Sequence, residues 1–107
     1  MGNIITIKQR DTARKISDTI TVSGVPLNLA GATVVLVMKN AVGGAVTRRN
    51  ATVVSAAAGT VEYQLVAGDT ENVASFQIEW EVTVSGGGIL TVPDSGYHWM
   101  DVIPDLG

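Results

Sequence analysis

Apolar and polar residues alternate along much of the chain, with the period of two that marks a half-buried β-strand. The longest such run spans residues 76–85, "FQIEWEVTVS", where every second residue from Phe76 to Val84 is apolar and the residues between them are polar. An antiparallel strand with one face in a core and the other in water has this pattern. We therefore predict a strand here, with Trp80 at the centre of the core.

Shorter runs repeat the alternation. Two of them place apolar residues on a single face: Val61, Tyr63 and Leu65 in one strand, and Ile16, Ile20 and Val22 in the other. Further strands are predicted at residues 3–8, near Val53 and between residues 89 and 103, with glycine-containing turns between the runs. Asp69 or Thr70 could cap a helix, so we predict one short helical turn near residues 69–74.

These patterns predict about seven to nine short strands in 107 residues, and no long helical pattern accompanies them. The lack of a long helical pattern excludes a parallel α/β sheet, because that architecture needs a helix between successive strands. A chain of this length is expected to form one domain. We predict an all-β fold, namely an immunoglobulin-like antiparallel β-sandwich in a single domain over residues 1–107.

The most apolar stretch, residues 24–40, reads "GVPLNLAGATVVLVMKN". It is too short to cross a membrane and contains Pro26, Asn28 and Gly31, so a membrane span is excluded. We divide it instead into a turn and a strand.

Alternate residues of that predicted strand point in opposite directions. Val34, Leu36 and Met38 are expected to fill the core. Val35 and Val37 then face outward, where an independent domain would carry polar side chains. An apolar outer stripe of this kind predicts a partner protein.

The charges are divided between the two halves of the chain. All seven Lys and Arg residues lie between Lys8 and Arg49 with only two acids, a net +5, whereas eight acids and no base follow from Asn50 onward. Either the two halves interleave and their charges meet across strands, which we favour, or a positive and a negative patch dock copies head to tail. The bases lack interleaved aromatic residues, so nucleic acid is not an expected partner.

No catalytic, cofactor or metal site is predicted. The chain has no cysteine and one histidine, His98, which excludes a multi-histidine metal site. Glu79 and Glu81 lie about 6.5–7 Å apart along one strand, which meets the carboxylate spacing of a glycosidase only superficially. We expect them instead on a solvated face opposite Lys39, Arg48 or Arg49.

A calcium site from Asp69, Glu71 and Asp94 lacks any ligand spacing of the EF-hand kind. The segment "GYHWM", residues 96–100, is of more interest. Tyr97 and Trp99 are predicted to share one strand face, and exposed aromatic side chains can stack on sugars or anchor a protein interface.

Three motifs carry a resemblance to a known family. They are "KQRDT" at residues 8–12, "VPLNLAGATV" at residues 25–34, and "GTVEYQLVAGDT" at residues 59–70 followed by the aromatic strand "IEWEV" at residues 78–82. With them the chain resembles the N-terminal domain of phage baseplate upper proteins, an immunoglobulin-like domain of tailed-phage virions. In the motifs, Gly59 is expected to make the hairpin turn before Val61, and Gly68 is expected to supply backbone with positive φ.

The resemblance implies a non-enzymatic structural protein that docks in several copies on the tail, the baseplate or the head. Alternatives are a capsid decoration or neck protein, and a carbohydrate- or receptor-binding module. From the sequence we expect a lone domain, without the long downstream region of baseplate upper proteins, and Val35 and Val37 stand where relatives carry polar residues. The interface candidates are Val35, Val37, Tyr97 and Trp99. The expected partners are other virion proteins, copies of the chain or a host surface glycan, in a virion assembled in the bacterial cytoplasm.

Overall fold

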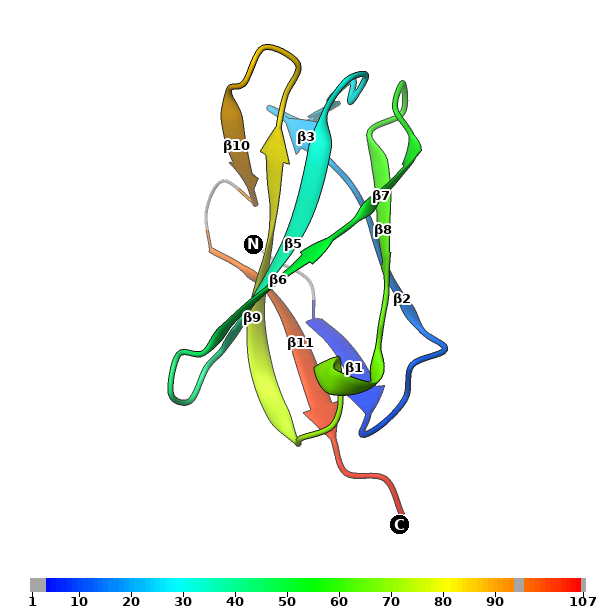
Figure 1. Cartoon of the computed structure of the whole chain (residues 1–107), viewed down its shortest axis with the longest axis vertical. Helices are drawn as coiled ribbons and strands as arrows, with labels where there is room; N and C mark the ends of the chain where they lie inside the picture. Colours follow the sequence, from blue (N-terminus) through cyan, green and yellow to red (C-terminus); the bar gives the residue numbers. More distant parts are fainter. Residues whose placement is uncertain (1–3, 94–95, 107) are drawn as a thin grey trace.

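The computed structural model describes residues 4–93 and 96–106, which form eleven strands and one 3-10 turn (Figure 1). The elements are β1 (Ile4–Lys8), β2 (Lys15–Thr19), β3 (Thr21–Val22), β4 (Val25–Pro26), β5 (Thr33–Asn40), β6 (Val46–Asn50), β7 (Thr52–Ser55), β8 (Thr60–Gln64), η1 (Ala67–Asp69), β9 (Ala74–Thr83), β10 (Ile89–Val92) and β11 (His98–Ile103). The prediction of an all-β fold is confirmed. The count exceeds nine because it includes β3 and β4, a hairpin of two-residue strands.

The strands form two sheets that face each other across the core. The first has the order β1-β11-β9-β5-β6, with β10 also paired to β9, and the second has the order β2-β8-β7. In the first sheet β1 runs parallel to β11, and the other pairs are antiparallel. This sandwich-like order is consistent with the predicted immunoglobulin-like arrangement. Each sheet combines strands from both halves of the chain.

The ten-residue strand β9 is the centre of the first sheet. Strand β5 pairs along it from Thr83 to Phe76. On the other side of β9, β11 pairs with its first half and β10 with its second half. Every strand of the first sheet except β1 and β6 is therefore bonded directly to β9.

The chain changes sheets between β6 and β7, which are separated only by Ala51 (Figure 1). The Ala51 N–H still donates to the Val34 carbonyl of the first sheet at 2.9 Å. One residue later the chain belongs to the second sheet, where the register shifts between Val53 and Ser55. A shift of this kind is a β-bulge, which redirects the side chain at its extra residue.

The core contains the residues that the alternation placed there. Trp80 is 1% exposed, and the inward residues of the predicted strands around Leu36 and Tyr63 are buried. Val22 is an exception, because it is 38% exposed. Strand β2 ends at Thr19, and Val22 pairs with Val25 in the separate hairpin, so the alternation does not continue through it.

The helical turn lies earlier than predicted, at Ala67–Asp69 rather than residues 69–74. Asp69 is its last residue and not its cap. The Asp69 carboxylate reaches back and accepts the Val66 N–H at 3.0 Å, which satisfies the amide before the turn. The expectation for Gly68 is wrong, because Gly68 is not among the glycines with positive φ.

Gly59 lies in the turn between β7 and β8, where a hairpin turn was expected, and it has a φ of +72° and a tightly enclosed backbone. Its carbonyl accepts the Ile20 N–H at 2.7 Å. A Cβ at this position would lie 2.8 Å from the Leu27 carbonyl oxygen and 2.9 Å from that of Ile20. Gly24 has a similar φ of +79°, but a Cβ there would meet no atom within 4 Å.

We predict that Gly59→Ala lowers the free energy of unfolding by about 2–5 kcal/mol, since a left-handed alanine and a backbone clash add together. Gly24→Ala is the matched control and should cost about 1–2 kcal/mol, because only the conformational term applies. Urea unfolding followed by tryptophan fluorescence measures both. Equal losses in the two variants would contradict the enclosed geometry around Gly59.

Candidate docking surface

The outer face of the first sheet carries the two valines of the predicted stripe. Val35 and Val37 alternate with the buried residues of β5 and are themselves half-buried. On β9 their partners in register are Glu81 and Glu79. On β6 Val35 lies opposite Asn50, and Val37 lies opposite the base Arg48. The apolar stripe therefore consists of two valines that follow each other along β5, and polar residues on both neighbouring strands border it.

An ion pair crosses this stripe. Arg48 on β6 bonds to Glu81 on β9, although β5 lies between the two strands. Because Arg48 is level with Val37 and Glu81 is level with Val35, the pair runs diagonally across β5 between the two valines. We attribute part of the valines' half-burial to these long side chains, whose stems can cover apolar surface.

The same ion pair accounts for one member of the carboxylate pair. Glu81 was expected to face Lys39, Arg48 or Arg49, and its contact with Arg48 confirms this expectation. Glu79 lies on the same outer face, level with Val37. Both carboxylates stand on a sheet surface, which does not supply the enclosing cleft that glycoside hydrolysis requires.

The aromatic segment is split between the two faces of β11. Met100 is fully buried, and His98 lies on the same inner face, level with Ile78. Trp99 is half-buried on the outer face. It is level with Gln77 of β9 and with Ile4 of β1. Tyr97 is exposed and precedes the strand.

The outer face of the second sheet has a different character. Its outward residues are hydroxyl, amide or charged side chains with one apolar member: Lys15, Ser17, Thr19, Thr60, Glu62, Gln64, Thr52 and Val54. Lys15 and Glu62 form an ion pair of 3.0 Å across β2 and β8. This composition is the one expected for a sheet face in contact with water.

Asp18 links the two sheets, a role that the sequence did not reveal. Its Oδ2 accepts the Trp80 indole N–H at 3.0 Å and lies 3.0 Å from His98 Nε2. The three residues come from β2, β9 and β11 and are far apart in sequence, so no local pattern announces the contact. Asp18 and His98 also line a pocket of about 240 Å³ with Val92 and Pro93.

A second polar cluster closes one end of the sandwich around Asp69, which is 6% exposed. Its Oδ2 accepts the Tyr63 hydroxyl and the Val66 N–H. Its Oδ1 lies 3.1 Å from both Nε and Nη2 of Arg49 on β6. Burial, together with the hydrogen bond to Asp69, raises the pKa of the Tyr63 phenol, while Arg49 opposes the shift. Four donors thus satisfy this buried carboxylate, and we assign it a structural role.

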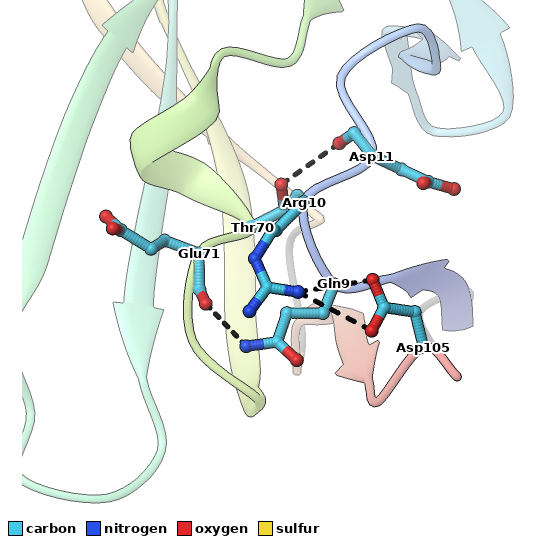
Figure 2. A network of polar contacts seen from close by, with 6 residues as sticks. All are labelled: Gln9, Arg10, Asp11, Thr70, Glu71 and Asp105. Atoms are coloured by element: carbon cyan, nitrogen blue, oxygen red, sulfur yellow. Dashed lines mark hydrogen bonds and ion pairs between the residues drawn. The ribbon is translucent and has the colours of Figure 1, made fainter. Parts of the chain in front are cut away.

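The motifs "KQRDT" and "GDT" meet next to this cluster (Figure 2). The Arg10 N–H donates to the Thr70 carbonyl at 2.9 Å, and the Thr70 hydroxyl donates to the Asp11 carbonyl at 3.0 Å. The Gln9 side-chain amide donates from Nε2 to the Glu71 backbone carbonyl at 2.7 Å. The two motifs thus fasten the end of β1 to the loop after η1, which is a structural task.

Arg10 occupies an unusual backbone conformation in this turn, with φ +71°. Non-glycine residues pay a conformational cost there. The conformation directs the Arg10 amide at Thr70, while the guanidinium lies 3.2 Å from Asp105 Oδ2 (Figure 2). One strained residue therefore joins the N-terminal turn to the segment after β11.

The ion pairs settle how the charge asymmetry is used. Each of the four that involve Lys or Arg joins a base from the first half to an acid from the second: Arg10–Asp105, Lys15–Glu62, Arg48–Glu81 and Arg49–Asp69. The expectation that the two halves interleave and that their charges meet across strands is confirmed. Most of the charge difference between the two halves is therefore cancelled by ion pairs within the molecule.

Over residues 4–93 and 96–106, no group of three or more His, Cys, Asp or Glu side chains is placed to hold a metal ion. Asp69 of the considered calcium set is bonded to Tyr63 and Arg49, and Asp94 lies outside the described residues. No helix among the described residues is long and apolar enough to cross a membrane.

We predict a loss of stability in alkali that depends on Tyr63. The pKa of its phenol is higher in the folded protein than the value near 10 of an unfolded tyrosine. The contribution of the protonated Tyr63 side chain to the free energy of unfolding is therefore complete below about pH 10 and is lost as the pH rises further. Urea unfolding at successive pH values should show wild-type stability falling relative to Tyr63→Phe by up to about 1.4 kcal/mol per pH unit.

Tyr97→Phe is the matched substitution, because it removes the same hydroxyl group from an exposed tyrosine. Tyr63→Phe is also expected to be less stable than wild type at neutral pH, since Asp69 loses a donor. Parallel slopes for the wild type and Tyr63→Phe above pH 10 would contradict the prediction.

Comparison with known proteins agrees with the resemblance. The sequence model of the family described as the BppU N-terminal domain matches residues 1–87. This range includes all the motifs that carried the resemblance and ends between β9 and β10. A search of curated proteins finds no match. Since the family model covers most of the chain, the protein belongs to the family of phage baseplate upper protein N-terminal domains, which are structural domains of the virion baseplate.

Proposed function

We propose that this chain is a non-enzymatic structural component of a tailed-phage virion, docked in several copies through the outer face of the first sheet. Family membership supports the coarse role at the baseplate and contact with other virion proteins. The choice of face rests on Val35 and Val37. The proposal treats residues 1–107 as one domain, since β10 and β11 pair with β9 although they lie beyond the matched residues.

The observation that carries the proposal is the difference between the two outer faces. The second sheet presents mainly hydroxyl and charged side chains, as a face in water should. The first presents Val35 and Val37 on β5, next to the central strand β9, and Trp99 beside Ile4 nearer its edge. Ile4 is 68% exposed. Protein interfaces combine apolar and polar contacts, and the polar residues beside the valines are Asn50 and Arg48 on β6 and the two glutamates on β9.

A carbohydrate- or receptor-binding module is the second candidate, based on Tyr97 and Trp99. Sugar sites combine an aromatic platform with several convergent polar groups. Trp99 has Gln77 on one side but the apolar Ile4 on the other. These surroundings favour a protein partner over a sugar.

The location within the particle is proposed from the family alone. Baseplate relatives favour the tail, while a capsid decoration or neck position would need the same kind of docking face. A hydrolase is not favoured, because Glu81 is held by Arg48 on an open sheet surface. Assembly in the cytoplasm of the bacterial host belongs to the same proposal.

We predict that the double variant Val35→Thr/Val37→Lys folds with a stability within about 1 kcal/mol of wild type, because both side chains are only half-buried. Its copy number in purified virions, measured by quantitative mass spectrometry, should fall severalfold. Val66→Thr/Val73→Lys applies the same changes to exposed valines elsewhere and should leave the copy number unchanged. Normal incorporation of the first variant would show that its face docks nothing.

Trp99→Ala separates the two candidates. As an interface residue, Trp99 should be needed for incorporation into the particle. As a receptor-binding residue, it should instead be needed for adsorption by particles that contain the normal number of copies. We expect the first outcome, measured by virion composition and host adsorption on the same preparations. Normal composition with lost adsorption would favour the binding module.

A further inference from the structure

Strand β10 has one edge that is not paired with another strand. Where β9 turns into β10, the Val84 N–H donates to the Gly88 carbonyl at 2.8 Å. Hydrogen-bonded pairs of an antiparallel ladder recur at every second residue, so Leu90 bonds to β9. The N–H and C=O groups of the residues on either side of it, Ile89 and Thr91, therefore point away from β9.

The described part of the chain leaves this edge open. Strand β1 pairs with β11 and begins at Ile4, which is level with Gln77 of β9, whereas β10 lies farther along β9, level with residues 80–83. Among the described residues, no hydrogen bond outside the β9 pairing involves the backbone of Ile89 or Thr91. Both residues are exposed, Ile89 to 68%. Figure 1 shows β10 at the margin of the molecule.

The other edge strands of the two sheets carry features that discourage pairing with another chain. Strands β1, β2 and β6 contain charged residues, and β7 is interrupted by the register shift between Val53 and Ser55. The charged residues are Lys8, Lys15, Asp18, Arg48 and Arg49. Charges and bulges are common protections of a sheet edge. Strand β10, with the sequence "ILTV", has neither.

The surroundings of this edge are also uncharged. Residues 82–93, which include β10 and the loop before it, contain no Asp, Glu, Lys, Arg or His, and Asp94 lies outside the described residues. Residues 19–38 are equally free of charge and include the β3–β4 hairpin, whose turn lines a pocket together with Val92. The molecule has a net charge of −3, but it can present this edge to a copy of itself without bringing like charges opposite each other.

The edge of β10 is complementary to itself. In an antiparallel pair of two β10 strands, Ile89 lies opposite Thr91 of the second copy, and Thr91 lies opposite Ile89 of that copy. Both pairs are then hydrogen-bonded, which uses the N–H and C=O groups that point away from β9. Leu90 meets Leu90 of the second copy on the two-fold axis, in a pair without hydrogen bonds whose Cα atoms are about 4.5 Å apart.

We propose that two copies of the chain pair through β10 in this register, which joins their first sheets into one. The unpaired groups are recognised by an extended backbone, and β10 is the uncharged, regular edge strand with which this chain can supply one. The contact is isologous, so it closes at two copies. The inference goes beyond the proposed docking and does not depend on it.

The pairing has a consequence for docking. Opposite residues of an antiparallel pair share one face of the sheet, so the outer faces of both copies lie on the same side. A four-residue edge makes a contact far smaller than the roughly 1,600 Å² of a standard interface, and it is weak between free molecules. Copies held side by side on a particle have an effective concentration on the order of millimolar, at which a weak contact becomes occupied.

Cysteine cross-linking tests the register, since the chain has no native cysteine. Leu90→Cys brings two thiols together at the two-fold axis, and a disulfide needs Cβ atoms about 3.5–4.5 Å apart. Val53→Cys is the matched control, because Val53 is also half-buried on an edge strand but adjoins the bulge of β7. Under mild oxidation at high protein concentration, we expect about tenfold more linked dimer from Leu90→Cys. Equal yields would overturn the inference.

Thr91→Pro tests the backbone hydrogen bonds themselves. Proline removes the Thr91 N–H, which points away from β9, so the fold loses no internal hydrogen bond. Thr91→Val keeps the N–H and is the matched control, and urea unfolding compares the stability of the two variants. In sedimentation equilibrium, wild type and Thr91→Val should form the same dimer, and association of Thr91→Pro should be weaker by about tenfold or more.

Three results of that measurement would contradict pairing through β10. They are a wild type that stays monomeric up to about millimolar concentration, an undiminished association of Thr91→Pro, and species larger than a dimer, because an isologous contact closes at two copies.

These outcomes are separate from those of the proposed function. Both measurements use purified protein, whereas the docking face is tested by virion composition. A Val35→Thr/Val37→Lys chain should dimerise like wild type while failing to enter particles. Loss of dimerisation in that variant would show that copies associate through the valine stripe and would overturn pairing through β10.

Discussion

The structure depends on strand β9, which is paired along both edges and whose alternate residues face the core and the outer surface. This strand pairs with β5 along one edge and with β10 and β11 along the other, so its register fixes that of nearly the whole first sheet. Its inner face carries Trp80, which is buried and also hydrogen-bonded to Asp18 of the opposite sheet. Its outer face carries Glu79 and Glu81. Core, sheet-to-sheet contact and outer surface are therefore set by ten consecutive residues.

The ends of the sandwich depend on polar contacts rather than apolar packing. Asp69 is buried and accepts from Tyr63, Arg49 and a backbone amide, which compensates for removing its charge from water. Beside it, Thr70 is fixed to the turn after β1 through Arg10 and Asp11. All of these residues except Arg49 lie in the motifs at residues 8–12 and 59–70. Their contacts are explained by closure of the fold and do not themselves indicate a binding site.

The alternation in the sequence was enough to predict most of the strands, most of the buried residues and the outward direction of Val35 and Val37, because each depends only on a period of two. Strand β6 and the β3–β4 hairpin were not predicted. Contacts that require two distant strands in register were not predictable from it. Trp99 lies beside Ile4 because β1 and β11, from opposite ends of the chain, pair in parallel. The Asp18 contact with Trp80 depends on how the two sheets face each other.

Local errors had local causes. Val22 continued the alternation of β2 in the sequence, but the chain turns into a separate hairpin before it. The helical turn was placed after Asp69 because an aspartate usually begins a helix. Here Asp69 ends the turn, since its carboxylate is drawn to Tyr63 and Arg49 inside the sandwich. The position of the turn thus depends on the contacts of Asp69 with distant residues, which the local sequence does not reveal.

The internal pairing of charges bears on how such a domain can assemble. Four of the seven bases are matched by acids of the second half within the molecule, which cancels much of the charge difference between the two halves. The proposed docking through the first sheet would gain most of its free energy by removing Val35, Val37 and neighbouring apolar surface from water. The Arg48–Glu81 pair crosses between the two valines, so such docking would also remove this pair from water, and the partner would have to compensate for its desolvation. Because its main contribution would come from apolar surface, such docking would depend only weakly on salt.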